Sequence, residues 1–216
     1  MDKFTLTPHL RLCPGIARTT AWLCMQLTRK FLFVLLAVVG ITTTTYAQKN
    51  QNMDKTQSEK KVLIVYFSAT GTTARAAEKL ANVTGGELYA ITPAQSYTDA
   101  DLDWHDKQSR SSVEMNDPKA RPALGGKKLN TSGYDVIFLG YPIWWNLAPR
   151  IIDTFIESHD LKNKILIPFA TSGSSTIANS VATLKKSYPE LNWKEGKLLN
   201  RMSENDIREW IGNLKY

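Results

Sequence analysis

Cysteine and histidine are scarce in this chain. Two cysteines, Cys13 and Cys24, and three histidines occur among 216 residues. Both cysteines precede residue 31, in an N-terminal segment that we expect to be removed from the mature protein. The rest of the chain has no thiol, so it can form no disulfide, use no cysteine nucleophile and hold no cysteine-ligated metal.

Two nucleotide-binding motifs are also missing from the sequence. The chain has no GxxxxGK[ST], whose lysine and hydroxyl serve phosphoryl transfer, and no GxGxxG, the dinucleotide fingerprint. Their absence argues against an ATPase, a kinase-like enzyme or a dinucleotide-binding fold. The sequence remains compatible with a loop of neutral hydrogen-bond donors that holds one terminal phosphate as an anchor.

The N-terminal segment is typical of a secretory leader. The run FLFVLLAVVGI at 31–41 is continuously apolar and follows Arg29 and Lys30. Small residues, Thr45 and Ala47, stand at the −3 and −1 positions of a cleavage site. Because the apolar run is short for a membrane span, we predict a cleaved leader; an uncleaved anchor helix is the alternative.

We therefore assign residues 1–47 to a signal peptide, with Met25 as an alternative start, and the polar residues 48–60 to a linker. Cleavage places the protein outside the cytoplasm, and we expect it in the periplasm. The leader carries five basic residues and one acidic residue, so its removal lowers the net charge from +7 to +3. That small charge predicts no nucleic-acid partner, and the cleaved chain is expected to have no membrane association.

Apolar runs and helical patterns alternate through residues 61–216, which we expect to form one domain. Three of the expected strands are apolar on both faces, which indicates a parallel sheet covered by helices on both sides. A polar stretch at 93–131 interrupts the alternation and has room for one helix near 99–109. The expected strands are 61–67, 86–91, 134–140, 164–170 and 196–199, and the other helices are 73–82, 149–158, 175–188 and 203–214.

Sheets of this kind bind ligands beyond the carboxyl ends of their strands. Three loops, 68–73, 141–148 and 171–176, are expected there. The first, SATGTT, combines hydroxyl donors with Gly71 just before a helix. The free N–H groups and the dipole of a helix N-terminus suit a phosphate; an ordinary helix cap is the alternative reading.

The second loop, YPIWWNLA, carries two adjacent tryptophans. An aromatic face at the end of a strand is a stacking platform for a flat conjugated ring. We expect Trp144 to be the platform and Trp145 to pack behind or beside it, with core anchoring of both as the alternative. The third loop, TSGSST, offers polar backbone to the edge of a ring lying on Trp144, or else a second helix cap.

A phosphate cradle, an aromatic face and a polar loop together describe a site for a mononucleotide with a large planar head. The strings VYFSATGTT, DVIFLGYPIWWNLAPRIIDTFIE and IPFATSGSSTIANS resemble the flavodoxin family over residues 61–214, especially a subgroup common in anaerobic bacteria. The resemblance implies a flavodoxin-like doubly wound five-stranded parallel α/β sheet of order 2-1-3-4-5, with FMN at the switch point of strand order. It also implies electron transfer, with redox proteins or a small-molecule acceptor as partners.

The resemblance assigns cofactor contacts residue by residue, and it implies neither a catalytic residue nor a metal ligand. The phosphate loop comprises Ser68, Ala69, Thr70, Gly71, Thr72 and Thr73; the ring-flanking loop comprises Pro142, Ile143, Trp144, Trp145 and Asn146; and the loop at the pyrimidine edge comprises Thr171, Ser172, Gly173 and Ser174.

Two departures from the family pattern keep a second function open. Electron-carrier flavodoxins are usually strongly acidic, whereas this mature chain carries +3, and the third loop lacks the aromatic residue that commonly covers the outer flavin face. Trp104 or His105, from the stretch 93–131, is a candidate to cover the outer flavin face instead. The alternatives are an FMN-dependent NAD(P)H oxidoreductase that reduces a quinone or other small acceptor, and a binding module that has lost flavin.

Overall fold

The computed structural model describes residues 60–214 and residue 216. The predicted signal peptide and all of the predicted linker except Lys60 lie outside the described residues. Within the described part of the chain, no helix is long and apolar enough to cross a membrane.

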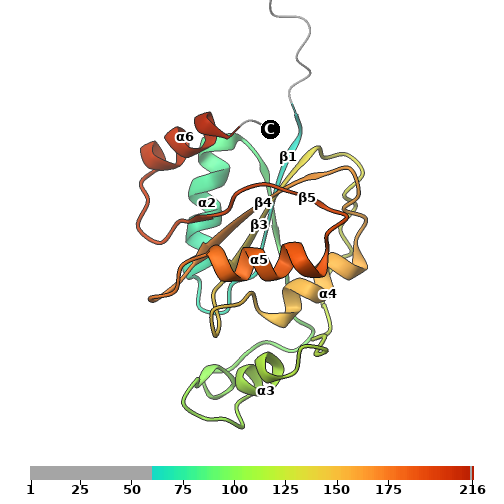
Figure 1. The fold of residues 1–216 in the computed structure, drawn as a ribbon, viewed down its shortest axis with the longest axis vertical. Helices are drawn as coiled ribbons and strands as arrows, with labels where there is room; N and C mark the ends of the chain where they lie inside the picture. The colour runs from blue at the N-terminus through green and yellow to red at the C-terminus, as the bar shows by residue number, and fades with distance from the viewer. Residues whose placement is uncertain (1–59, 215) are drawn as a thin grey trace, which may run out of the picture. The chain divides into compact units, whose positions relative to one another are not determined.

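A parallel sheet forms the centre of the domain (Figure 1). Its strand order is β2-β1-β3-β4-β5, and β6 also pairs with β4, so two short strands share the fifth position. This order confirms the predicted flavodoxin-like topology. The strands are β1 (Val62–Tyr66), β2 (Glu87–Ala90), β3 (Val136–Pro142), β4 (Ile165–Thr171), β5 (Asn192–Trp193) and β6 (Lys197–Leu198).

Pro168 explains why the fifth strand is split. The carbonyls of Leu166 and Ala170 accept hydrogen bonds from Lys194 and Leu199 at 2.8 and 2.9 Å. Pro168 lies between them on the same edge of β4 and has no N–H to offer. The ladder is therefore interrupted at 194–196, a break that the sequence analysis did not predict.

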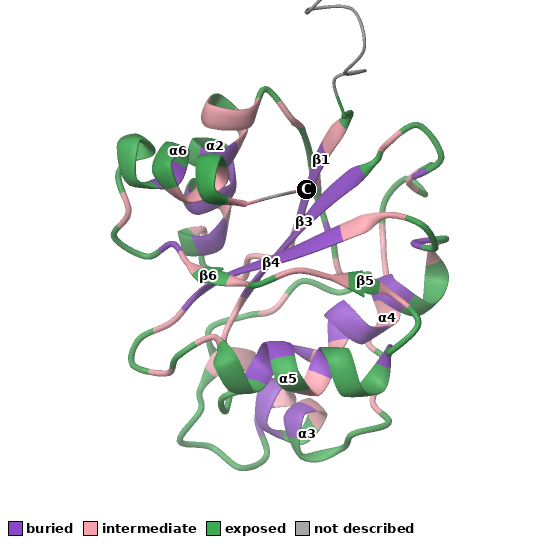
Figure 2. Ribbon diagram, turned by 45° about the horizontal axis from the view of Figure 1, so that its top comes forward, coloured by how far each residue is buried: buried purple, intermediate pink, exposed green. Residues whose placement is uncertain are grey.

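Helices cover both faces of the sheet, as the two-sided apolar strands predicted. Helices α2 (Thr72–Thr84) and α6 (Glu204–Asn213) pack on one face, and α4 (Arg150–Ser158) and α5 (Ala178–Ser187) pack on the other. Residues of β3 alternate between the two cores: Phe138 joins the α2 and α6 side, and Leu139 joins the α4 and α5 side. Figure 2 shows the buried β3 and β4 between these layers.

The stretch 93–131, called the insert below, joins β2 to β3. It holds a short 3-10 helix, η1 (Ala100–Leu102), and the helix α3 (Arg110–Asn116). The predicted helix near 99–109 is wrong in position, because Ser109 caps a helix that starts one residue later: its Oγ accepts from the backbone N–H of Ser112 at 3.3 Å. Figure 1 shows the insert, in green, beyond one end of the sheet.

Candidate functional site

The three predicted loops meet at one cavity of about 550 Å³ beyond the carboxyl ends of β1, β3 and β4. The insert closes part of its wall with Leu102, Trp104 and Ser111. The predicted site residues that line the cavity are Ser68, Ala69, Thr70, Thr73, Pro142, Ile143, Trp144, Trp145, Asn146, Ser172, Gly173 and Ser174.

Three predicted site residues, Gly71, Thr72 and Thr171, do not line this cavity. The Thr171 side chain is buried, and its hydroxyl lies 2.8 Å from the hydroxyl of Thr73. Thr72 is exposed, and its Oγ1 accepts from the Arg75 guanidinium at 3.4 Å. The structure therefore places Thr171 in a contact between two loops and Thr72 on the outer side of the first loop.

The first loop leaves the start of α2 open. Gly71 occupies the N-cap position with φ of 82°, a left-handed conformation that favours glycine. No side chain among the described residues caps this helix, so the alternative reading of the Ser and Thr cluster as an ordinary helix cap is wrong. The first N–H groups of α2 remain available to an anion.

A tight turn shapes the second loop. Trp144 and Leu147 exchange two backbone hydrogen bonds of 3.0 and 2.9 Å, and the two residues between them, Trp145 and Asn146, have φ of 46° and 64°. Positive φ is uncommon outside glycine, and bulky residues in this region are strained. Strain of this kind clusters at functional sites.

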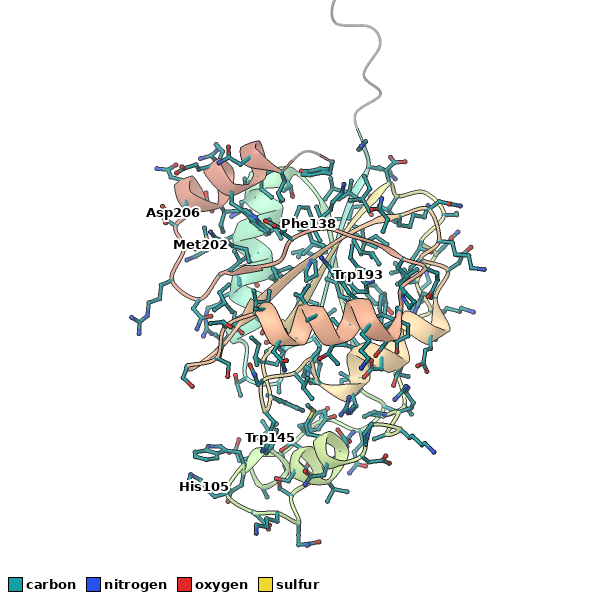
Figure 3. All side chains as sticks on the ribbon, viewed as in Figure 1. His105, Phe138, Trp145, Trp193, Met202 and Asp206 are labelled. Atoms are coloured by element: carbon teal, nitrogen blue, oxygen red, sulfur yellow. The ribbon has the colours of Figure 1, made fainter. Side chains whose placement is uncertain are left out.

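The two tryptophans differ in burial. Trp144 is half-buried and meets Phe67 and Tyr97 edge to face, with ring centroids 5.7 and 5.4 Å apart. Trp145 is 46% exposed, so the alternative that both tryptophans anchor the core is wrong for Trp145. The left-handed backbone turns Trp145 outward, and Figure 3 shows it on the side of the molecule where the insert lies.

Asn200, which follows β6, holds the third loop. Its Oδ1 accepts from the backbone N–H of Ser172 at 2.8 Å, and its amide donates to the Ser172 carbonyl. Helix α5 begins only at Ala178, without a side-chain cap among the described residues. The reading of this loop as a second helix cap is therefore wrong, and Ser172, Gly173 and Ser174 stay at the cavity.

From the insert, Trp104 is 66% exposed and lines the cavity. His105 does not line it; its ring is tilted by 34° against the Trp104 ring, with the ring centroids 3.5 Å apart. Ser111 was missed by the sequence analysis. It is 1% exposed, and its hydroxyl has no hydrogen-bond partner in the described structure. A serine within a polar stretch gives no sequence signal for such a position.

Tyr97 fixes the insert against the second loop. Its hydroxyl donates to Glu114, and the Arg110 guanidinium lies 4.0 Å from its ring centroid. Arg110 Nε also donates to Glu114 Oε1 at 2.7 Å. Burial, followed by the hydrogen bond to Glu114, raises the pKa of Tyr97. These contacts hold α3 beside the ring that supports Trp144.

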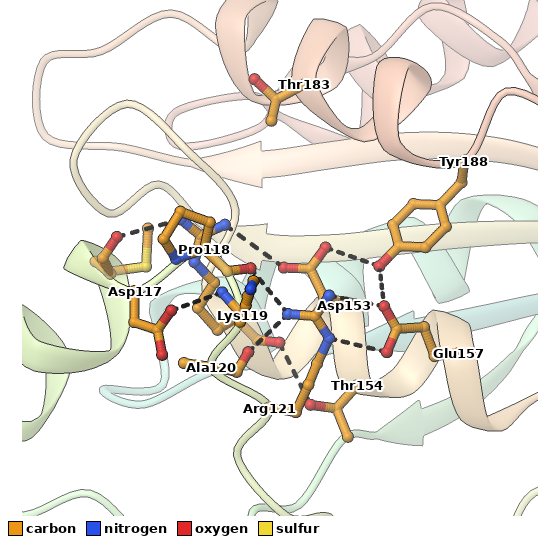
Figure 4. A network of polar contacts seen from close by, with 12 residues as sticks. Asp117, Pro118, Lys119, Ala120, Arg121, Asp153, Thr154, Glu157, Thr183 and Tyr188 are labelled. Carbon is orange, nitrogen blue, oxygen red and sulfur yellow. Dashed lines mark hydrogen bonds and ion pairs between the residues drawn. The ribbon is translucent and has the colours of Figure 1, made fainter.

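A second polar network ties the end of the insert to α4 and α5 (Figure 4). Arg121 binds both oxygens of Glu157 at 2.8 Å. The Tyr188 hydroxyl lies 2.9 Å from Glu157 Oε1 and 3.0 Å from Oδ1 of the buried Asp153. The insert is thus anchored at both ends rather than held by its own short helix alone.

The cavity lining is uncharged: it contains no Asp, Glu, Lys, Arg or His among the residues that the structure describes. Those residues also form no cluster of three or more His, Cys, Asp or Glu that could hold a metal ion. The Arg75 guanidinium donates to Thr72 Oγ1 at 3.4 Å, on the outer side of the first loop. The cavity can therefore offer hydroxyls, backbone amides and aromatic surface, but no fixed charge of its own.

Comparisons with known proteins agree with this geometry. No functionally curated protein matches the chain. A structure from Bacteroides eggerthii DSM 20697, described as a candidate flavoprotein, is 67% identical over 71% of this chain and 96% of its own, with a TM-score of 0.70. A similarly described structure from Bacteroides uniformis ATCC 8492 is 58% identical over 71% and 99%, also with a TM-score of 0.70.

A flavoprotein from Lactobacillus acidophilus NCFM, solved in complex with FMN, shares the fold at 23% identity. The match covers 70% of this chain and 99% of that protein, with a TM-score of 0.57. The sequence model described as Flavodoxin matches residues 61–214, which is nearly the whole described domain, and the chain therefore belongs to the flavodoxin family.

Proposed function

We propose that the chain binds FMN in the cavity at the carboxyl ends of β1, β3 and β4, and passes electrons to and from a redox partner protein. One observation carries the proposal: three loops far apart in the sequence converge on a single uncharged cavity of about 550 Å³. Family membership supports it, and so does the shared fold of the Lactobacillus acidophilus protein that was solved with FMN.

The residues present fit this cofactor. The open N-terminus of α2 and the hydroxyls of Ser68, Thr70 and Thr73 suit the phosphate. The Ser68 hydroxyl is buried and has no partner in the described structure, as expected of a donor reserved for a ligand. The indoles of Trp144 and Trp145 supply aromatic surface for the ring, and the loop 172–174 supplies polar backbone for its edge.

FMN, when bound, supplies the electron-carrying ring. The protein positions that ring, limits its contact with water and sets the charge around it. Because no cation lines the described cavity, negative charge added to a bound group gains no ionic stabilisation there. We therefore expect the lining to disfavour the most negatively charged form of the cofactor.

The second candidate is an FMN-dependent NAD(P)H oxidoreductase that reduces a quinone or another small planar acceptor. The observation that favours it is the exposed aromatic surface of Trp104 and Trp145, both of which line the cavity. Such a surface suits stacking of a flat molecule at the cavity mouth. In the first proposed function, by contrast, a redox partner protein would dock at the cavity mouth.

The visible absorption spectrum of the purified protein is the first test. A yellow protein, or a colourless one that takes up added FMN, supports the proposal, and a colourless protein that ignores FMN overturns it. NADPH added to the holoprotein under argon then separates the two functions. Rapid bleaching without a partner reductase indicates an enzyme, and persistent colour supports an electron carrier.

We also propose that the protein works outside the cytoplasm, on the strength of the leader-like residues 1–47. Mass spectrometry of the protein from a periplasmic fraction tests this. An N-terminus at Gln48 supports export and cleavage, whereas an intact leader on a protein confined to the cytoplasm contradicts it.

A further inference from the structure

Ser111 brings a polar group to the cavity from outside the three loops. It lies in the first turn of α3, in the insert, and is 1% exposed. Its hydroxyl has no hydrogen-bond partner in the described structure, although the residue lines the cavity. A buried hydroxyl without a partner is rare enough to require an explanation.

The usual structural role of a helical hydroxyl does not explain Ser111. Ser158, Ser180 and Thr183 donate to backbone carbonyls three or four residues earlier in their helices. The neighbouring Ser112 is also satisfied, since its hydroxyl lies 2.9 Å from Ser109 Oγ and donates to the Asp106 carbonyl at 2.7 Å. Ser111 alone in this helix presents a buried free hydroxyl to the cavity.

Hydrogen bonds of the neighbouring residues hold the start of α3, and with it the backbone of Ser111, in place before a ligand binds. On one side, Arg110 is held by Glu114 at 2.7 Å and by the carbonyl of Gln95 at 2.8 Å. On the other, Ser109 caps the helix through the Ser112 N–H. Farther along α3, the Met115 carbonyl accepts from Arg150 at 3.2 Å. The backbone that carries the Ser111 hydroxyl is therefore held in place in advance, which reduces the entropy lost on binding.

We propose that Ser111 is a cofactor-binding residue whose hydroxyl bonds a polar atom of the flavin ring or its ribityl chain. This inference rests on the proposed FMN function and extends it to the insert. The phosphate is the less suitable partner, because the open N-terminus of α2 already provides for it. The insert instead contacts Trp144, the residue that we propose to lie against the flavin ring: the ring centroids of Tyr97 and Trp144 are 5.4 Å apart.

The test compares Ser111→Ala with Ser112→Ala, its buried neighbour, using FMN titration and thermal unfolding of the apoprotein. Ser111→Ala should weaken FMN binding about three- to tenfold, the range expected for one hydrogen bond. Its apoprotein should unfold at the same or a higher temperature than wild type, because the change removes an unsatisfied group. Ser112→Ala should lower the unfolding temperature, because it breaks two bonds within the protein.

Riboflavin, which lacks the phosphate, should show the same loss of affinity with Ser111→Ala. Equal FMN affinity in Ser111→Ala and wild type would overturn the inference and leave the proposed function intact. A loss that vanishes with riboflavin, or a lower unfolding temperature of the Ser111→Ala apoprotein, would also overturn it. A wild-type protein that binds neither FMN nor riboflavin would overturn the proposed function itself.

Discussion

The hydroxyl of Thr73 lies 2.8 Å from the hydroxyl of Thr171, although 98 residues separate them in the sequence. Thr73 belongs to the first turn of α2, and Thr171 ends β4. Both side chains are buried, so this bond directly joins the predicted phosphate loop to the predicted pyrimidine loop. This pair of side chains therefore adds a direct link between two parts of the site to the backbone ladder of the sheet.

Replacing Thr73 with Val should weaken the link between these loops. Val has nearly the same shape but cannot form a hydrogen bond, so the Thr171 hydroxyl would stay buried without a partner, at a cost of about 1–3 kcal/mol in unfolding free energy. FMN affinity should fall as well, because Thr73 also lines the cavity. Urea unfolding and FMN titration measure the two effects.

Thr73→Ser is the matched control, since it keeps the hydroxyl and loses only a methyl group. It should retain most of the stability and affinity that Thr73→Val loses. If both variants behave alike, the methyl contact rather than the hydrogen bond stabilises this junction.

The sequence could predict the sheet and the loops because both depend on local patterns. Runs that are apolar on both faces, such as VIFLGY in β3, indicate buried parallel strands wherever they occur. The carboxyl ends of such strands share one edge, so the meeting of three hydroxylated or aromatic loops followed from the strand pattern alone.

The features that sequence analysis missed depend on packing between distant segments. Trp144 forms T-shaped contacts with Phe67 and Tyr97, and Tyr97 comes from the polar insert. The positive φ of Trp145 and Asn146 has no glycine to signal it. Ser111 reaches the cavity only through the packing of α3, which no local sequence pattern encodes.

Trp145 offers a direct measurement of backbone strain at the site. Trp145→Gly relieves the left-handed conformation, whereas Trp145→Ala removes the same ring and keeps the strain. We expect the Gly variant to be more stable than the Ala variant by about 1 kcal/mol in urea unfolding. Both should lose a similar part of their FMN affinity. An Ala variant as stable as the Gly variant would show that the turn carries no strain.

Gly140 lies in the middle of β3, paired in register with Phe169 of β4. A Cβ atom at residue 140 would overlap the ring of Phe169, which is fully buried. Gly140→Ala should therefore lower the unfolding free energy by about 3 kcal/mol or prevent folding. The measurement is urea unfolding, with soluble yield as a second readout where the variant does not fold.

The double variant Gly140→Ala with Phe169→Leu isolates this clash. Leu at residue 169 vacates part of the space, so the pair should be more stable than the sum of the two single effects predicts. Strictly additive effects would place the cause in the backbone of β3 rather than in the Phe169 ring.

Asp153 and Glu157 lie one turn apart on α4 and share the hydroxyl of Tyr188, yet their pKa values shift in opposite directions. Burial raises the pKa of Asp153 above its ordinary 3.8, against the opposing effects of Tyr188, Arg121 and Arg150. The hydrogen bond from Arg121 lowers the pKa of Glu157 below its ordinary 4.5. The two carboxylates should therefore affect the pH dependence of stability with opposite signs.

A raised pKa in the folded state means that the folded protein holds the Asp153 proton more tightly than the unfolded chain does. The stability that Asp153 contributes is present below about pH 4 and is lost as the pH rises through its folded pKa. Wild type should consequently lose unfolding free energy relative to Asp153→Asn as the pH rises from about 4 through the folded-state pKa of Asp153. Glu157→Gln should give the reverse, with wild type gaining relative stability as the pH rises from the lowered folded-state pKa of Glu157 to about 4.5 and keeping it at higher pH. Urea unfolding of the three proteins from acid to neutral pH measures both slopes, and slopes of the same sign would contradict the assigned environments.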